Sequence, residues 1–316
     1  MSSLEVIRTG PLSLIEDLGR AGYAALGVGL SGAADRSSYA AANALLGNDV
    51  GAAAVECLLG GLSVTAVGEL SIAVTGAPAP ITIDGGPADH AARLEVADGQ
   101  VVKLGTPKTG LRSYLAVAGG IVVPEVLGSR SRDTLSGIGP EPLRRGDSLP
   151  IGIAPRPGPG SAVGSTAPAR SASSAADSSA ARSANEIVTL RAMLGPRANW
   201  FSNPGDLASI EWIVSPQSNR VGLRLDRVEP GSPPGSVPSE VAAGERALRR
   251  KDSRELASEG LALGSVQVPP SGQPVLFLAD HPVTGGYPVV AVVVDADVDR
   301  AAQVRPGQQL RFKWVR

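Results

Sequence analysis

The sequence predicts a mainly β protein made of two domains. Glycine and proline number 39 and 26 in a chain of 316 residues, which favours many turns between short elements. Short β-branched runs recur along both halves of the chain, with turn residues between them. A low-complexity segment separates the two halves. Regular short strands with turn signals are typical of barrels and sandwiches.

The first half contains a series of strand-like runs and one helix. Asp98-Gly99 lies between two of the runs and is a strong hairpin signal. A helix is predicted over 37–46, because Asp35 can cap its start and Gly47 can end it. The expected strands are 62–67, 70–75, 81–83, 94–96, 101–104, 114–117 and 121–123.

The second half follows the same pattern. A helix is predicted over 296–303, before the stop signal Pro306-Gly307. The expected strands are 187–190, 211–214, 221–225, 265–268, 275–278, 289–294 and 309–314.

Two segments of unusual composition mark the organisation of the chain. Residues 154–185 are Ala, Ser, Pro and Gly with almost no large apolar side chain, so they cannot offset their ordering entropy. We expect a flexible linker between domains at 1–153 and 186–316. Residues 229–258 are rich in Pro and Gly and then densely charged, as in a solvated loop; the alternative is a lid or a partner-binding loop.

Charge and hydropathy argue against several classes of partner. The net charge is −1, so no basic excess indicates nucleic acid or an anionic membrane. The longest apolar run, 288–294, is too short to cross a bilayer, and the first residues lack signal-peptide features. The single cysteine argues against a disulfide framework or a thiolate metal site. We expect a cytoplasmic protein with no metal centre.

The first candidate site follows the strand predicted at 275–278. Asp280 and His281 could move a proton there. The glycine pair just beyond them allows close approach of backbone to a ligand, or serves a tight turn with positive φ. The further candidates in this segment are Thr284, Gly285, Gly286 and Tyr287.

A second polar cluster lies between two strand-like runs. Its arginine suits bidentate binding of a carboxylate, and its amides suit an amide carbonyl. The alternative is a polar turn with a structural salt bridge. The candidates are Ser215, Gln217, Ser218, Asn219 and Arg220.

The first half supplies weaker candidates. Ser129 and Arg130 lie in a Gly- and Ser-rich loop that could form an anion nest, or a solvated loop pairing with Asp133. Ser31 and Asp35 precede the first predicted helix, where a simple cap is the alternative.

Three further residues have structural interpretations. Glu56 lies between apolar residues and would be a costly buried carboxylate unless partnered, so it is a candidate polar anchor. The neighbouring Cys57 is expected in the core, and His90 is expected to be exposed.

These clusters resemble one family in order and sequence. The chain is similar to the family of the 5-oxoprolinase C subunit, also called allophanate hydrolase subunit 2 or the biotin-dependent carboxyltransferase-like family. The matching segments are Gly10-Pro11-Leu12, 16–20, 31–35, 42–45, Glu56, 115–121, 127–131, 215–220, 267–269, 279–280, 284–288 and 303–307.

The resemblance implies two cyclophilin-like β-barrel domains and an enzyme made of several different chains. Two further proteins would complete ATP-dependent hydrolysis of 5-oxo-L-proline to L-glutamate. They are the B subunit, which is similar to a sporulation kinase inhibitor, and the A subunit. The chain has no nucleotide loop, so ATP would be bound jointly or by a partner. It also has no biotin-attachment motif.

Two other functions remain open. Related domains in urea carboxylase transfer a carboxyl group from biotin to urea, so the chain could belong to a carboxyltransferase that acts on urea or allophanate. A third alternative is a regulatory protein that binds a kinase-inhibitor-like partner. The chain departs from the family pattern at Ala34, at Arg197 and at 281–283, which leaves the exact amide substrate open.

Overall fold

The computed structural model describes residues 2–154, 186–228, 248–252 and 254–315. Nearly all of the predicted linker, and residues 229–247 and 253 of the predicted charged loop, therefore lie outside the described residues. The chain divides into two compact units. Of the described residues, the first unit takes 2–20, 35–133 and 137–154, and the second takes 21–34, 134–136 and those from 186 to 315. The sequence-based boundary had placed 21–34 and 134–136 in the first domain.

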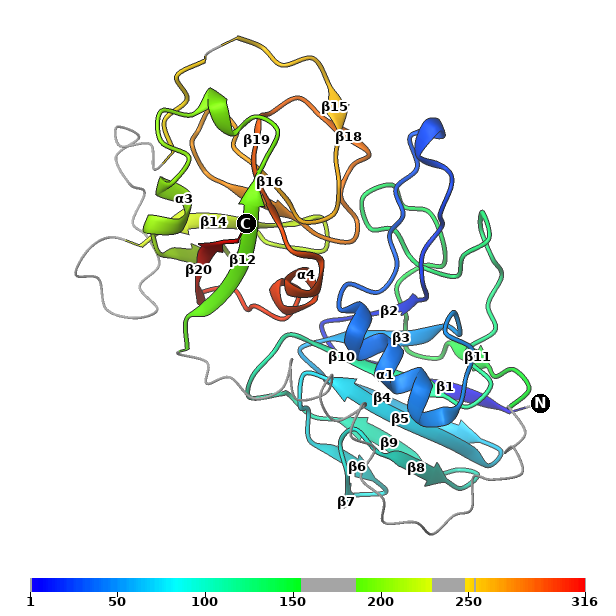
Figure 1. Cartoon of the computed structure of the whole chain (residues 1–316). Helices are drawn as coiled ribbons and strands as arrows, with labels where there is room; N and C mark the ends of the chain where they lie inside the picture. Colours follow the sequence, from blue (N-terminus) through cyan, green and yellow to red (C-terminus); the bar gives the residue numbers. More distant parts are fainter. Residues whose placement is uncertain (1, 155–185, 229–247, 253, 316) are drawn as a thin grey trace. The chain divides into compact units, whose positions relative to one another are not determined.

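The first unit contains two antiparallel sheets and the helix α1 (Arg36–Leu46), which packs against β5 and β10 (Figure 1). In sheet order, one sheet is β11 (Ser148–Pro150), β1 (Ser3–Thr9), β4 (Leu62–Val67), β9 (Val101–Leu104), β6 (Ile81–Ile83) and β7 (Gly86–Ala88). The other is β2 (Leu12–Glu16), β3 (Ala54–Leu58), β10 (Arg112–Val117), β5 (Leu70–Gly76) and β8 (Arg93–Val96).

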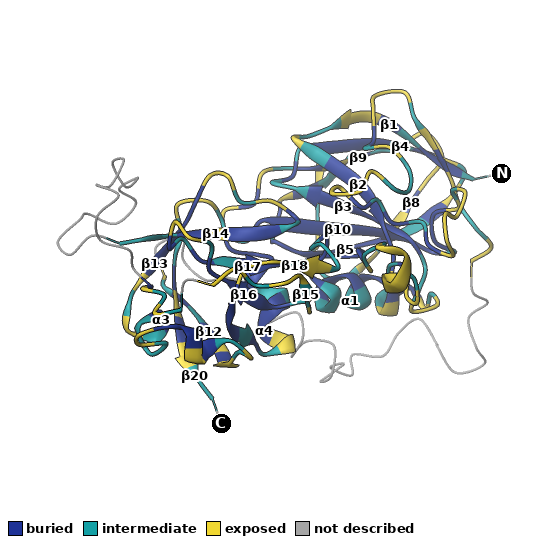
Figure 2. Cartoon of the chain, turned by 90° about the horizontal axis from the view of Figure 1, so that it is seen from above, coloured by how far each residue is buried: buried dark blue, intermediate teal, exposed yellow. Residues whose placement is uncertain are grey.

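Strand β10 is buried along its whole length (Figure 2). Alternate side chains of a strand point to opposite faces, and both faces of β10 are covered. Leu115 and Val117 join the apolar core, whereas the ring of Tyr114 lies 6.4 Å from the ring of Tyr39 on α1. The helix therefore covers the face of this strand that the core does not.

Of two local sequence signals in the first half, the helix cap is confirmed and the hairpin is wrong. The cap prediction for α1 is confirmed: the Asp35 carboxylate accepts a hydrogen bond from Ser38 N at 3.0 Å, and Gly47 ends the helix at φ 68°. The hairpin predicted at Asp98-Gly99 is wrong, because β8 and β9 belong to different sheets. That turn instead crosses between sheets, with the Asp98 carboxylate accepting from Gly68 N at 2.7 Å.

The second unit contains a closed barrel. It closes where β12 pairs in parallel with β20, while the other neighbours are antiparallel. In order around the barrel, the strands are β12 (Val188–Leu194), β19 (Val289–Val293), β16 (Ser265–Gln267), β17 (Val275–Phe277), β14 (Gly222–Arg227), β13 (Trp212–Val214) and β20 (Gln309–Trp314). The mainly β prediction is therefore confirmed.

The second unit also contains several short strands, helices and 3-10 turns. The two-residue strands β15 (Glu259–Gly260) and β18 (Thr284–Gly285) pair with each other. The helices of this unit are α3 (Asp206–Ser209) and α4 (Asp295–Ala301), and the 3-10 turns are η1 (Ala24–Leu26) and η2 (Ala198–Trp200). Among the described residues, no helix is long and apolar enough to span a membrane.

Candidate functional site

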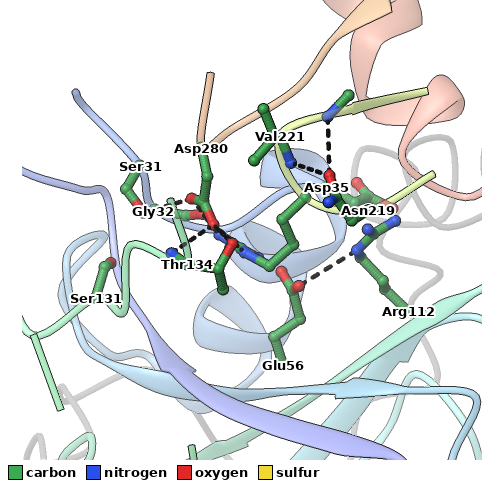
Figure 3. A network of polar contacts seen from close by, with 12 residues as sticks. Ser31, Gly32, Asp35, Glu56, Arg112, Ser131, Thr134, Asn219, Val221 and Asp280 are labelled. Carbon is green, nitrogen blue, oxygen red and sulfur yellow. Dashed lines mark hydrogen bonds and ion pairs between the residues drawn. The ribbon is translucent and has the colours of Figure 1, made fainter. Parts of the chain in front are cut away.

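A buried carboxylate, that of Asp280, collects donors from three segments of the second unit. Ser31 Oγ donates to Asp280 Oδ1 at 2.7 Å, and Thr134 donates to Oδ2 from both Oγ1 (2.6 Å) and N (3.0 Å). Arg220 binds the same carboxylate through Nε (2.8 Å) and Nη2 (3.1 Å), and Nη2 also donates to Gly32 O at 2.6 Å. Figure 3 shows Ser31 and Thr134 directed at the carboxylate. We call these five residues the Asp280 junction.

Local backbone structure brings Arg220 and Asp280 together. Asn219 Oδ1 accepts from the N–H groups of Val221 (2.9 Å) and Gly222 (3.3 Å), which fixes the turn before β14. The ladder between β14 and β17 then continues beyond its ends, because Asp280 N donates to Arg220 O at 3.1 Å. The ion pair therefore joins neighbouring backbone segments.

The junction keeps Asp280 ionised. Burial by itself would raise the pKa of Asp280, but the charge of Arg220 and the hydrogen bonds from Arg220, Thr134 and Ser31 outweigh it. The net pKa lies below the usual range of an aspartate. A carboxylate with this many donors is poorly suited to move a proton.

The same geometry changes the role predicted for Arg220. The sequence suggested that its guanidinium would hold the carboxylate of a ligand. In the structure it makes a bidentate pair with the carboxylate of Asp280, and Arg220 is only 3% exposed. The alternative interpretation, a structural salt bridge beside a polar turn, describes this arrangement.

His281 offers a different possibility. Its Nδ1 lies 2.8 Å from Pro282 O, and a carbonyl oxygen can only accept a hydrogen bond. Nδ1 therefore carries a proton, and in the neutral ring the lone pair lies on Nε2. The imidazole is half-buried, with its centroid 6.2 Å from that of Phe277. His281 can thus accept a proton at Nε2.

The turn after His281 is shaped by close packing. Thr284 and Gly285 form β18, and Gln267 Nε2 donates to Tyr287 O at 2.8 Å. Gly285 and Gly286 are not among the positive-φ residues, so a turn with positive φ does not explain them. A Cβ on Gly285 would lie 2.7 Å from Gln267 Nε2, so a larger residue there would displace the Gln267 side chain that binds Tyr287 O. Tyr287 is exposed at the end of this turn.

Most side chains of the 215–220 cluster maintain its own turn. Ser218 N donates to Ser215 O at 3.0 Å, and Ser218 Oγ accepts from Arg224 N at 3.0 Å. Asn219 Oδ1 already accepts two backbone N–H groups, so it is engaged locally and not directed at a ligand. Ser215 is buried, whereas Gln217 is exposed.

In the first unit, the loop predicted as an anion nest does surround an anion. That anion is the carboxylate of Asp17, which accepts from Ser129 Oγ (2.6 Å), Ser131 Oγ (2.6 Å) and Arg130 N (2.6 Å). Gly19 N also donates to it, at 2.8 Å. We call this group the Asp17 loop. The guanidinium of Arg130 lies elsewhere, where its Nη1 is 2.8 Å from Glu125 Oε1.

The second polar group of this unit centres on Tyr114. Its hydroxyl donates to Glu56 Oε2 at 2.7 Å and accepts from Asp35 N at 2.7 Å. Arg112 Nε lies 3.3 Å from Glu56 Oε1. Burial, together with the charges of Glu56 and Asp35, raises the pKa of Tyr114 well above its usual value. Glu56 is therefore a partnered polar anchor as predicted, and Asp35 is a helix cap.

The structure also decides two predictions about single residues. His90 is half-buried, not exposed: burial lowers the pKa of its imidazole, and its Nε2 has no hydrogen-bond partner among the described residues. Cys57 lies in the core as predicted. No group of His, Cys, Asp and Glu in the described part of the chain could hold a metal ion.

Sequence reasoning missed four residues of these groups, namely Thr134, Asp17 as an acceptor, Tyr114 and Arg112. Asp17 lies in one of the segments that match the family, and its acidic side chain was the available signal. Thr134 had none, because a lone threonine in a loop is ordinary.

Comparisons with known proteins show which family the chain belongs to. A family model described as the carboxyltransferase domain, subdomain A and B, matches residues 26–314. The chain is 36% identical to the C subunit of 5-oxoprolinase from Escherichia coli K12, over 98% of this chain and 90% of that protein. It is 30% identical to urea amidolyase of Lachancea kluyveri, over 98% of this chain but only 17% of that protein.

A solved structure of a urea amidolyase is also similar to this chain. The crystal structure of the K. lactis urea amidolyase superposes with a TM-score of 0.81 at 27% identity, covering 99% of this chain and 19% of that one. The family model spans both units of the chain, and the similarity to the E. coli protein covers nearly all of both sequences. The chain belongs to the carboxyltransferase domain family, subdomain A and B, which includes the 5-oxoprolinase C subunit.

Proposed function

We propose that this chain is one component of a cytoplasmic, ATP-dependent 5-oxoprolinase that hydrolyses 5-oxo-L-proline to L-glutamate together with the A and B subunits. The observation that carries the proposal is the 36% identity to a 5-oxoprolinase C subunit over 98% of this chain and 90% of that protein. Similarity of this extent over the whole length supports an equivalent place in a complex.

ATP would supply activation of the amide by phosphorylation. The loop of this chain best suited to an anion does not fit a phosphate, because the Asp17 carboxylate already takes its hydroxyl and N–H donors. We therefore assign nucleotide binding to a partner protein or to a site completed by one. No step assigned to this chain uses ATP directly.

His281 is the residue that we propose for proton transfer. When water adds to the carbon of the activated amide, its proton moves to the Nε2 lone pair of His281, and the ring C–N bond then breaks as the leaving nitrogen takes up that proton. The phosphoryl group from ATP would remain on the acyl phosphate left by this cleavage, and a second water would release it as inorganic phosphate and leave the carboxylate of glutamate. The hydrogen bond from Nδ1 to Pro282 O holds the tautomer that this step needs. Asp280, the other candidate, is held ionised by Arg220.

The second candidate function is that of a carboxyltransferase component that acts on urea or allophanate. The 30% identity to urea amidolyase favours it, although the chain spans 17% of that protein. A biotin carrier would then come from another protein. The regulatory alternative, binding of a kinase-inhibitor-like protein, stays a prediction.

Reconstitution tests the proposal. The chain purified with the A and B subunits is expected to release glutamate from 5-oxoproline only with ATP, and omission of any one component should stop it. Urea and allophanate serve as competing substrates. A complete, folded complex that consumes either of these and leaves 5-oxoproline intact would reject the proposal in favour of the second candidate.

A matched variant tests His281. His281→Asn keeps a donor near Pro282 O but removes the Nε2 lone pair, so we expect kcat to fall by about 100-fold or more with KM little changed. His281→Gln is the companion variant. Normal turnover of both variants would exclude His281 from proton transfer.

A further inference from the structure

The Asp280 junction joins parts of the chain that are far apart in sequence. Asp280 lies 249 residues from Ser31 and 146 from Thr134, yet both donate to its carboxylate. Ser31 belongs to residues 21–34 and Thr134 to residues 134–136, the two segments of the N-terminal half that group with the C-terminal unit. The junction is therefore a point where both segments are attached to that unit.

The attachment fixes an unfavourable backbone conformation. Ser31 has φ 55°, in the left-handed region that residues other than glycine avoid, and Gly32 follows at φ 91°. The ion pair holds this turn twice, through the Ser31 hydroxyl on Asp280 and through Gly32 O on Arg220. Such strain persists only where the surroundings over-determine it.

A small apolar contact supports the same segment. Ala34 packs with Ala279, the neighbour of Asp280, and with Ala302, just after α4. Residues 31–34 are thus held at one end by polar contacts and at the other by apolar ones. If the polar contacts are lost, the turn at Ser31 and Gly32 should become mobile first, because Ala34 keeps its apolar contacts.

We propose that Asp280 is a positioning residue that, with Arg220, fastens the Ser31–Gly32 turn and Thr134 to the barrel, and does not itself transfer a proton. The consequence for activity rests on the proposed function, whereas the consequence for the two segments does not. Neutralising Asp280 would remove the negative charge that binds the Arg220 guanidinium and weaken the hydrogen bond that the Ser31 hydroxyl donates.

Hydrogen exchange of the full chain, followed by mass spectrometry, tests the structural part. In Asp280→Asn we expect exchange in peptides covering 21–34 and 134–136 to rise by about tenfold or more, with β12 and β19 still protected. Wild-type exchange in both segments would overturn the proposal. If this variant fails to fold, Thr134→Val, which adds no unpaired charge, should raise exchange at 134–136 alone, and an unchanged rate there would overturn the proposal equally.

A matched control lies in the same unit. Asp297 is also buried and ion-paired, with Arg191 Nε at 2.9 Å and Arg300 Nη1 at 3.2 Å, and these ion pairs reach neither segment. Asp297→Asn should leave exchange in 21–34 and 134–136 at the wild-type rate. An equal rise in the control would show general destabilisation and overturn the specific role of Asp280.

The reconstituted complex tests the second part. In Asp280→Asn we expect a lower kcat/KM with every limb of the pH–rate profile retained, because His281, and not Asp280, is proposed to transfer the proton. Loss of a limb with unchanged exchange would overturn the proposal and make Asp280 an acid–base group. If the wild-type complex releases no glutamate, the proposed function fails while the exchange result still decides the positioning role.

Discussion

Asp17 and Asp280 are both buried carboxylates that organise loops, one in each unit, but their donors differ in kind. Asp17 accepts from two hydroxyls and two backbone N–H groups, all of them neutral. Asp280 has two hydroxyl donors and one N–H, and in addition the guanidinium of Arg220. Of the two groups, the Asp280 junction is therefore the one in which the carboxylate also binds a buried cation.

This difference in donors predicts how the loss of each carboxylate affects the stability of the protein. Removing a carboxylate from neutral donors leaves hydroxyls that can turn to each other, whereas removing it from a buried cation takes away the opposite charge that offsets the cost of burying that cation. The reach of the two groups differs as well. The Asp17 loop ties one loop to the end of β2, while the Asp280 junction ties two separate segments to a barrel.

The largest effect is expected from Asp280→Ala. It removes the carboxylate that makes a bidentate ion pair with the buried guanidinium of Arg220, so the free energy of unfolding should fall by about 3–5 kcal/mol. Urea denaturation of the full chain measures this loss. The double variant Arg220→Met with Asp280→Leu removes both charges and should recover part of it; a double variant less stable than Asp280→Ala would contradict the account.

A smaller loss is expected from Asp17→Ala. Its former donors are neutral, and Ser129 and Ser131 are already linked by a bond from Ser131 N to Ser129 Oγ at 3.0 Å. We expect a loss of about 1–3 kcal/mol in the same urea experiment. A loss at Asp17 exceeding that at Asp280 would show that the buried cation is not what distinguishes the two groups.

The smallest effect concerns pH. The pKa of Asp280 is lowered in the folded state, so its stabilisation is present above the unfolded pKa and is lost as pH falls through the folded pKa. The difference in unfolding free energy between wild type and Asp280→Asn should be constant above about pH 5 and shrink below the ordinary aspartate value of 3.8. A difference that grows toward acid pH would contradict the sign of this linkage.

Much of the architecture could be predicted from local patterns. β-branched runs between turn residues indicated the strands, and Asp35 with Gly47 correctly bounded α1. The Asp98-Gly99 signal failed because a tight turn shows only that the chain reverses, and sheet membership of the flanking strands is decided by their distant partners. For the same reason, the boundary at the low-complexity segment could not show that 21–34 and 134–136 group with the second unit.

For the candidate site, too, the sequence indicated some features and the folded structure decided the others. The order of residue types established which chemical groups are present: an arginine that binds carboxylates, an aspartate after a strand, a glycine pair and a loop able to surround an anion. The folded structure determined which groups bind each other. It paired Arg220 with Asp280, filled the anion nest with Asp17 and set the proton of His281 on Nδ1. Residue types fix what a side chain can bind, but which donor meets which acceptor depends on contacts between segments up to 249 residues apart, and these exist only in the folded chain.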